Sequence, residues 1–157
     1  MIRPTVPEDT PRLVELVRDT GVFKPHEVET LREVLDDFHR ESHKENHHSI
    51  TMVQHDHIVG FAYFAPAPMT DRTWQLYWIA VEQRDQAKGL GGTLLKEVEE
   101  QIKKLGGRVL FIETSSLDHY DKTRRFYLKK GYEQDAVLRD FYTDGDSMVV
   151  FRKRLLR

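Results

Sequence analysis

Residues 86–91 read Gln-Ala-Lys-Gly-Leu-Gly, a composition that suits an anion-binding turn. An apolar, aromatic segment at residues 74–81 precedes this turn, and residues 93–105 after it carry apolar side chains at helical spacing. A helix that begins in such a turn directs unpaired backbone N–H groups and the positive end of its dipole outward, where phosphate oxygens bind. The sequence therefore predicts a phosphate-binding turn between a strand and a helix.

The glycine spacing separates this turn from two nucleotide-binding motifs. A dinucleotide fingerprint needs G-x-G-x-x-G, and a P-loop needs Gly-Lys followed by Ser or Thr. The turn has neither, since its spacing is Gln-x-x-Gly-x-Gly. A tight turn that binds no ligand has a similar composition, so the glycine spacing alone does not exclude this second interpretation.

The elements around the turn predict one mixed α/β sheet covered by helices. The first helix is expected to begin with Thr5 as N-cap and Glu8 three residues later. An Asp-Gly pair at residues 144–145 predicts a hairpin turn near the end of the chain. The expected elements are strand 1–3, helix 5–20, helix 28–38, strands 49–53, 58–65 and 74–81, helix 93–105, strand 108–114, helix 121–130, and strands 135–142 and 147–155.

In the helix expected at residues 93–105, apolar side chains recur at helical spacing and predict the buried face. The charged side chains, Glu99 among them, are expected on the opposite, solvated face. The buried set is expected to be Leu94, Val98, Ile102 and Leu105.

Length and composition suit one domain, residues 1–157, with a sizeable core. The formal net charge of −2 provides no basic field for nucleic acid. The chain has no cysteine, which excludes a disulfide framework, a thiolate nucleophile and a cysteine-based zinc site. Apolar runs are shorter than the roughly 20 residues of a membrane-spanning helix and no signal-peptide pattern is present, so we expect a cytoplasmic protein without membrane or nucleic-acid partners.

Six of the eight histidines lie between residues 39 and 57. His39, His43 and His47 have i, i+4 spacing, so one helix face could carry metal ligands. Charged residues surround these histidines and the H-E-x-x-H pattern is absent, so we expect a solvated helix end and no metal. We likewise expect the basic run Arg152–Arg154 to mark an exposed edge strand.

Together with the strand before it, the Gln-x-x-Gly-x-Gly segment resembles the signature of the GNAT superfamily, the acyl-CoA-dependent N-acyltransferases. Residues 78–81, Trp-Ile-Ala-Val, are similar to the family's central strand, and residues 125–132, Arg-Phe-Tyr-Leu-Lys-Lys-Gly-Tyr, to its last helix and following turn. Residues 2–4 and 8–9 look like its opening strand and helix, so the resemblance covers nearly the whole chain. It implies a GNAT-like α/β fold with about seven mostly antiparallel strands, a central splayed parallel pair and four flanking helices.

The resemblance also implies that acetyl-CoA is the acyl donor. Backbone groups of Ile79 and Val81 are expected to bind the pantetheine amides, because the family's central strand has a bulge there. The pyrophosphate is expected on the glycine turn, where a backbone without Cβ atoms can approach phosphate. Tyr120 stands where many members have an asparagine that contacts the pantetheine arm. The expected cofactor-binding turn comprises Gln86, Ala87, Lys88, Gly89, Leu90, Gly91 and Gly92.

For activity, the resemblance implies an N-acetyltransferase that moves an acetyl group from acetyl-CoA to a primary amine. Direct transfer in a ternary complex is expected, since a chain without cysteine cannot carry the acyl group on a thiol. A non-catalytic acyl-CoA sensor or partner module on the same fold is the alternative. The resemblance further implies that the chain can pair as a homodimer.

Two residues are expected to move protons. Tyr127 corresponds to the family's helical tyrosine and is expected to protonate the departing thiolate, with a half-buried core aromatic as the competing interpretation. Glu113 is similar in position to the base of the ribosomal-protein alanine acetyltransferases. Strand alternation places it on one face with Val109 and Phe111, so we expect a partly buried carboxylate with a raised pKa. A salt-bridged glutamate at a strand end is the alternative.

The acceptor pocket of this superfamily is usually built from the connector between the first two helices and from the final hairpin. Here the connector contributes Phe23 and Glu27, the hairpin contributes Tyr142, and Tyr77 precedes the glycine turn. Aromatic and acidic side chains suit a cationic amine. The identity of that amine stays open among polyamines, aminoglycosides, amino acids, peptide N-termini and protein lysines.

Overall fold

The structure is a computed structural model that describes residues 1–40, 46–86 and 89–156. Apart from α3, the helices and strands follow one another in the order that the sequence pattern predicts, with two short 3-10 turns, η1 and η2, ahead of α1 and α5. In chain order the elements are β1 (Ile2–Pro4), η1 (Pro7–Asp9), α1 (Thr10–Asp19), α2 (Pro25–Arg40), β2 (His48–Gln54), β3 (His57–Pro66), β4 (Thr73–Val81), α3 (Gln83–Gln86), α4 (Leu90–Lys104), β5 (Val109–Ser115), η2 (Asp118–Tyr120), α5 (Asp121–Lys129), β6 (Glu133–Thr143) and β7 (Asp146–Arg154).

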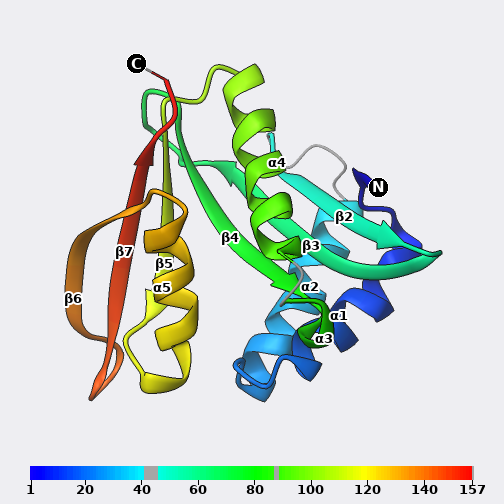
Figure 1. The fold of residues 1–157 in the computed structure, drawn as a ribbon, viewed down its shortest axis with the longest axis horizontal. Coiled ribbons are helices and arrows are strands. Elements are labelled where there is room, and N and C mark those ends of the chain that lie inside the picture. Colours follow the sequence, from blue (N-terminus) through cyan, green and yellow to red (C-terminus); the bar gives the residue numbers. More distant parts are fainter. Residues whose placement is uncertain (41–45, 87–88, 157) are drawn as a thin grey trace. The chain divides into compact units, whose positions relative to one another are not determined.

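The strands form a seven-stranded sheet in the order β1-β2-β3-β4-β5-β7-β6. β4 and β5 run parallel. Pairing is antiparallel between β1 and β2, β2 and β3, β5 and β7, and β6 and β7. The four longer helices are α1, α2, α4 and α5 (Figure 1). The predicted mixed sheet with one parallel pair and four helices is therefore confirmed.

Two compact units make up the chain. Unit 1 comprises Met1–Ala65 and Trp78–Val98, and unit 2 comprises Pro66–Tyr77 and Glu99–Arg157. The three boundaries fall before the last residue of β3, inside β4 and inside α4. The glycine turn therefore belongs to unit 1, whereas both predicted proton-transfer residues belong to unit 2.

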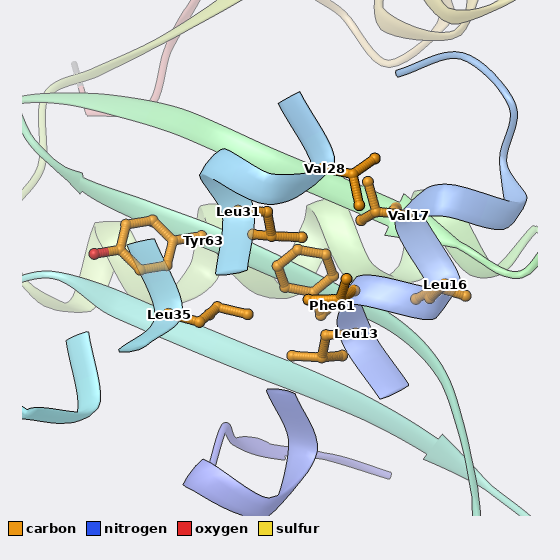
Figure 2. Packing of buried hydrophobic residues seen from close by; sticks show 10 residues of the cluster. Leu13, Leu16, Val17, Val28, Leu31, Leu35, Phe61 and Tyr63 are labelled. Carbon is orange, nitrogen blue, oxygen red and sulfur yellow. The ribbon is translucent and has the colours of Figure 1, made fainter. Parts of the chain in front are cut away.

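In unit 1, α1 and α2 bury a common apolar cluster against β3. Each helix carries apolar residues at spacings of three and four, which gathers them on one face. Phe61 and Tyr63 are two residues apart on β3 and so project to the same side of the strand. Figure 2 shows the helix side chains around the Phe61 ring. The buried cluster comprises Leu13, Val14, Leu16, Val17, Val28, Leu31, Leu35, Phe61, Tyr63 and Ala80.

In unit 2, β5 is paired differently on its two sides. Its parallel register with β4 runs from the pair Thr73–Val109 to the pair Leu76–Ile112. Its antiparallel register with β7 continues through Ser115 without a shift. Beyond the pair Leu76–Ile112, the positions of the β5 residues are therefore set by their pairing with β7.

The two faces of β5 carry different side chains. Tyr127 on α5 makes a ring contact with Phe151 on β7, so α5 lies on the face that carries Phe151. Phe151 lies opposite Ile112, which therefore shares this face. Glu113 lies opposite Val150 and projects to the other face, because successive side chains alternate.

The first helix begins in a different way from the prediction. Thr5 does not cap it, because the Thr5 hydroxyl lies 2.7 Å from Ser49 Oγ in a buried polar cluster. Asp9 is the capping acid instead: its Oδ2 atom accepts the Val6 backbone N–H at 2.9 Å and pairs with Arg3 at 2.7 Å. The sequence pattern identified the correct turn but the wrong residues in it.

In the helix after the glycine turn, the bounds and the buried residues also differ from the prediction. α4 begins at Leu90, three residues earlier than expected, and ends one residue before Leu105, whose side chain is exposed. Glu99 is buried rather than solvated. Leu95 and Ile102 flank it at spacings of four and three, which places it on the apolar face.

The basic run Arg152–Arg154 does not lie on an edge strand as predicted. It belongs to β7, which lies between β5 and β6, and β6 is the edge strand of the sheet. Lys153 within this run pairs with Glu99 at 3.1 Å. The run is therefore part of the interior pairing of the sheet.

Candidate functional site

The glycine turn leads directly into α4. Gly89 has a φ of 76°, in the left-handed region that favours glycine. Its carbonyl accepts the backbone N–H of Thr93 at 3.2 Å. Gly91 and Gly92 therefore occupy the first turn of the helix, where backbone N–H groups have no acceptor within the helix. This places the N–H donors of a 15-residue helix where the sequence predicted an anion site.

The chain before the glycine turn is held to α1. Gln86 is the last residue of α3, a helical turn that the sequence pattern did not predict. Gln83 at the start of α3 donates through Nε2 to the Thr20 carbonyl at 2.6 Å. Two further residues of the predicted turn, Ala87 and Lys88, lie outside the described residues.

The end of β4 carries the residues expected to bind the pantetheine arm. Val81 is buried and Ile79 is half-buried. The next residue, Glu82, donates its backbone N–H to the Val59 carbonyl at 2.8 Å, which ties the end of β4 to β3. The expected contacts of the Ile79 and Val81 backbones with pantetheine amides stay a prediction.

Tyr127 lies near the C-terminal end of α5. The helix ends at Lys129, and Gly131 lies just past this end, as the sequence pattern predicts, with a φ of 90°. The Gly131 N–H donates to the Leu128 carbonyl at 3.2 Å, and the Tyr132 N–H donates to the Tyr127 carbonyl at 3.1 Å. These two bonds fix the last turn of the helix and, with it, the backbone of Tyr127.

The Tyr127 ring is buried among other aromatic rings. Its centroid lies 5.5 Å from that of Phe126, 5.8 Å from Tyr132 and 5.6 Å from Phe151. Burial raises the pKa of the Tyr127 hydroxyl above the ordinary value for tyrosine. The phenol is therefore fully protonated at neutral pH, as a proton donor must be. Its predicted catalytic role stays a prediction.

A buried polar cluster in unit 2, the Glu99 cluster, consists of Glu99 on α4, Lys153 on β7 and Tyr132 between α5 and β6. The Tyr132 hydroxyl donates to Glu99 Oε2 at 2.7 Å. Lys153 Nζ lies 3.1 Å and 3.2 Å from the two Glu99 oxygens and donates to the Lys130 carbonyl at 2.9 Å. The sequence pattern did not indicate this cluster, because the charge of Glu99 placed it with the residues expected on the solvated face. Apolar residues four before and three after Glu99 are the signal that could have found it.

Glu113 and Tyr77 lie together in unit 2. Each is one residue beyond the last parallel pair, Leu76–Ile112. The Glu113 residue is exposed, yet neighbouring atoms remove part of its hydration and raise the pKa of its carboxyl group, in the predicted direction. Burial, and then the negative charge of Glu113, raise the pKa of the Tyr77 hydroxyl. That hydroxyl donates to Gln75 Oε1 at 2.7 Å.

The two acceptor residues predicted in unit 1 have structural contacts of their own. The Phe23 ring lies 5.3 Å from the Trp78 ring and packs against the apolar cluster of unit 1. Glu27 Oε1 accepts the Lys24 backbone N–H at 2.8 Å, at the start of α2. A role for Phe23 and Glu27 in acceptor binding stays a prediction.

Tyr142 lies in an irregular part of the final hairpin. The register of β6 with β7 shifts between Leu138 and Thr143, so the residues between them leave the regular ladder. Tyr142 is exposed there and makes an edge-to-face contact with Phe141, with 5.2 Å between ring centroids. Two aromatic rings are thus presented to solvent on the hairpin.

Three histidines of residues 39–57, His39, His47 and His48, contact aromatic rings. His47 Nδ1 lies 2.6 Å from the Tyr63 hydroxyl, and the His48 ring stacks on Phe64. His43 lies outside the described residues. Across residues 1–40, 46–86 and 89–156, no group of three or more His, Cys, Asp or Glu side chains is arranged to hold a metal. None of the helices in these ranges is both long and apolar enough to cross a membrane.

Comparisons with known proteins agree with this geometry. The sequence model described as the acetyltransferase (GNAT) family matches residues 11–132. No curated protein matches the chain at a significant level. Among solved structures, a protein from Desulfovibrio desulfuricans assigned to the acetyltransferases of the GNAT family is similar over 99% of this chain and 98% of its own, with a TM-score of 0.94 and 36% identity.

Two more distant structures share the fold. An aminoglycoside 6'-N-acetyltransferase complexed with coenzyme A has a TM-score of 0.80 at 20% identity, over 100% of this chain and 98% of its own. A ribosomal-protein alanine N-acetyltransferase from Escherichia coli has a TM-score of 0.79 at 16% identity, over 100% of this chain and 94% of its own. The family match includes both the glycine turn and Tyr127, and the chain belongs to the GNAT family of acetyltransferases.

Proposed function

We propose that the chain is an acetyl-CoA-dependent N-acetyltransferase that acetylates a primary amine by direct transfer in a ternary complex. The observation that carries this proposal is the start of α4, where Gly89 adopts a positive φ and glycines fill the first helical turn. This arrangement suits a pyrophosphate, and the family of the chain consists of acetyltransferases. The absence of cysteine argues against a thiol-bound acyl intermediate.

Bound acetyl-CoA supplies an activated acyl group, and the chain has to hold it in place. Backbone N–H groups of residues 89–92 bind the pyrophosphate, assisted by the helix dipole. Lys88, which lies outside the described residues, adds positive charge to that turn. Backbone groups of Ile79 and Val81 hold the pantetheine amides.

Glu113 acts as the general base in this proposal. An alkylamine with a pKa of roughly 10.4 is almost wholly protonated at neutral pH and has to lose a proton before it attacks. The raised pKa of Glu113 makes its carboxylate a stronger base than an ordinary glutamate. Tyr77 lies beside it and shares the acceptor side.

Tyr127 acts as the general acid. It gives its phenolic proton to the departing sulfur, whose thiol has a pKa near about 8.5 and leaves more readily when protonated. The raised pKa of Tyr127 keeps the proton on the phenol until that step. Its ring contacts with Tyr132 and Phe151 hold the hydroxyl in one orientation.

The acceptor is a cationic primary amine in this proposal. Glu113, Tyr77 and Tyr142 provide a carboxylate and aromatic rings in unit 2, and Phe23 and Glu27 provide the same chemistry in unit 1. Such groups attract an ammonium ion before it loses its proton. Two structures of the same fold carry the names of enzymes for an aminoglycoside and for an alanine of a ribosomal protein, so both kinds of amine belong in an acceptor screen.

A thiol-release assay with acetyl-CoA and pooled amines tests the function. We expect release of CoA with at least one amine class, and Tyr127→Phe should lower kcat with little change in acetyl-CoA binding. Tyr63→Phe is a matched control, because Tyr63 is also buried but belongs to the apolar cluster of unit 1. Tight CoA binding without turnover on any amine would support the alternative, a non-catalytic acyl-CoA sensor. An unchanged kcat in Tyr127→Phe would remove that residue from the mechanism.

We also propose that two copies of the chain pair through β6. This edge strand has eleven residues, all exposed, and includes Val137 and Leu138. An exposed edge strand is a template for strand pairing. Antiparallel pairing about a twofold axis at Val137 sets the two Val137 side chains opposite each other, in the stretch where β6 keeps a regular register with β7.

A further inference from the structure

Thr114, near the end of β5, has a buried hydroxyl group without a hydrogen-bond partner among the described residues. The residue is 6% exposed, and its Oγ1 atom makes no hydrogen bond. Burying a hydroxyl in this state destabilises a fold. The neighbouring Ser115 has the ordinary arrangement, since its hydroxyl donates to Asp146 Oδ1 at 2.5 Å and accepts the Leu117 N–H at 3.1 Å.

The shape of the side chain does not account for a threonine at this position. Valine has the same branching at Cβ and suits a strand equally well, but it has no hydroxyl to leave unpaired. A buried position that served packing alone would therefore be filled better by valine. The other buried side-chain atoms without partners in the described residues, on Thr10, His39 and Glu82, all belong to unit 1.

The position of Thr114 relates it to Tyr127. Thr114 lies opposite Val149 on β7 and so shares the face of β5 that carries Ile112 and faces Phe151. Tyr127 makes its ring contact with Phe151 on that face. On β5, Thr114 lies two residues after Ile112, which is the last β5 residue that pairs with a β4 residue of unit 2. Its hydroxyl thus lies at the end of β5, on the side of the proposed general acid.

We propose that Thr114 Oγ1 donates a hydrogen bond to a carbonyl oxygen of the bound acyl donor. This inference rests on the proposed function, because it requires an acyl-CoA ligand. A threonine hydroxyl rotates freely and donates one hydrogen bond, which a carbonyl oxygen accepts. The carbonyl belongs either to an amide of the pantetheine arm or to the thioester. CoA and acetyl-CoA distinguish the two, since CoA has the amides but no thioester.

The test compares Thr114→Val with the wild-type protein in two measurements. Thermal unfolding without ligand should give an equal or higher Tm, because the substitution removes an unpaired buried hydroxyl and keeps the shape. Isothermal titration should give a Kd raised about 3- to 10-fold, the change expected for one lost hydrogen bond. A higher Kd for both CoA and acetyl-CoA assigns the bond to an amide, and a higher Kd for acetyl-CoA alone assigns it to the thioester.

Thr10→Val is the matched control. It makes the same substitution at another buried threonine without a hydrogen-bond partner, at the start of α1 in unit 1. We expect no change in either Kd for this variant. If Thr114→Val does not fold, the pair Thr114→Ser and Thr114→Ala carries the test, and only the serine variant should keep the wild-type Kd.

The outcomes separate this inference from the proposed function. If the wild-type protein binds neither CoA nor acetyl-CoA, the proposed function fails and the inference fails with it. If the wild-type protein binds both and the folded Thr114→Val variant binds them with the same Kd values, the proposed function stands and the role of Thr114 is wrong.

Discussion

Removal of the Lys153 side chain should destabilise the fold through the Glu99 cluster. The Glu99 side chain is 9% exposed and the Lys153 side chain 29% exposed. Lys153→Met leaves the Glu99 carboxylate with the Tyr132 hydroxyl as its remaining bond in the cluster. Loss of one partner from a buried ion pair costs about 3–5 kcal/mol. Because Lys153 is partly solvated, we expect a smaller loss of about 2–3 kcal/mol in the free energy of unfolding.

Urea unfolding followed by circular dichroism measures this change, and thermal unfolding gives a second reading. For a chain of this length, each kcal/mol corresponds to roughly 2–4 °C, so the Tm should fall by roughly 4–12 °C. Lys129→Met is the control, since Lys129 is exposed at the end of α5. We expect that variant to stay within about 0.5 kcal/mol of the wild-type protein.

A double variant separates the charge effect from a loss of packing. Glu99→Gln combined with Lys153→Met removes the buried charge but keeps an amide oxygen that accepts the Tyr132 hydroxyl. The double variant should therefore be more stable than Lys153→Met alone, by about 1–2 kcal/mol. A double variant that is less stable than the single one would refute the reasoning, because the two losses would then be independent.

Two further predictions concern the base and the dimer. In the pH profile of kcat/KM, the acidic limb should lie above the ordinary glutamate value of 4.5, because activity falls as pH drops through the raised pKa of Glu113 and the carboxylate is protonated. Glu113→Gln should lower kcat/KM and abolish that limb, and a limb that persists would place the base elsewhere. Val137→Asp and Val137→Lys should each yield monomers in sedimentation velocity, because each sets like charges opposite each other, whereas a mixture of the two variants should form a heterodimer. A wild-type monomer, or a mixture that stays monomeric, would disprove this pairing.

Local patterns predicted the elements of the fold because their determinants are local. The Asp-Gly pair at residues 144–145 gave the final hairpin, and Gly131 gave the end of α5. The parallel pair β4–β5 followed from the family resemblance rather than from periodicity. Helix boundaries were less well predicted, since α4 includes Gly91 and Gly92 in its first turn although glycine has a low helix propensity.

The partners of the buried polar groups could not be predicted in the same way. Glu99 is charged, and charged residues are seldom buried without a partner. Its partners Tyr132 and Lys153 lie 33 and 54 residues further along the chain, so only the folded structure brings them together. Thr114 escaped notice for a related reason: a threonine in a strand is ordinary, and only its unpaired hydroxyl distinguishes it.

The proposed base and the proposed acid lie on opposite faces of β5. Glu113, the proposed base, lies on one face, whereas Thr114 lies on the face of Tyr127, the proposed acid. In amide formation the base takes a proton from the amine and the acid gives a proton to sulfur, so separate faces keep the carboxylate from drawing the proton of the phenol. A shift of one residue in the register of β5 would exchange these faces. The register is held by the unbroken pairing of β5 with β7, which makes that pairing as much a requirement of the proposed chemistry as the residues themselves.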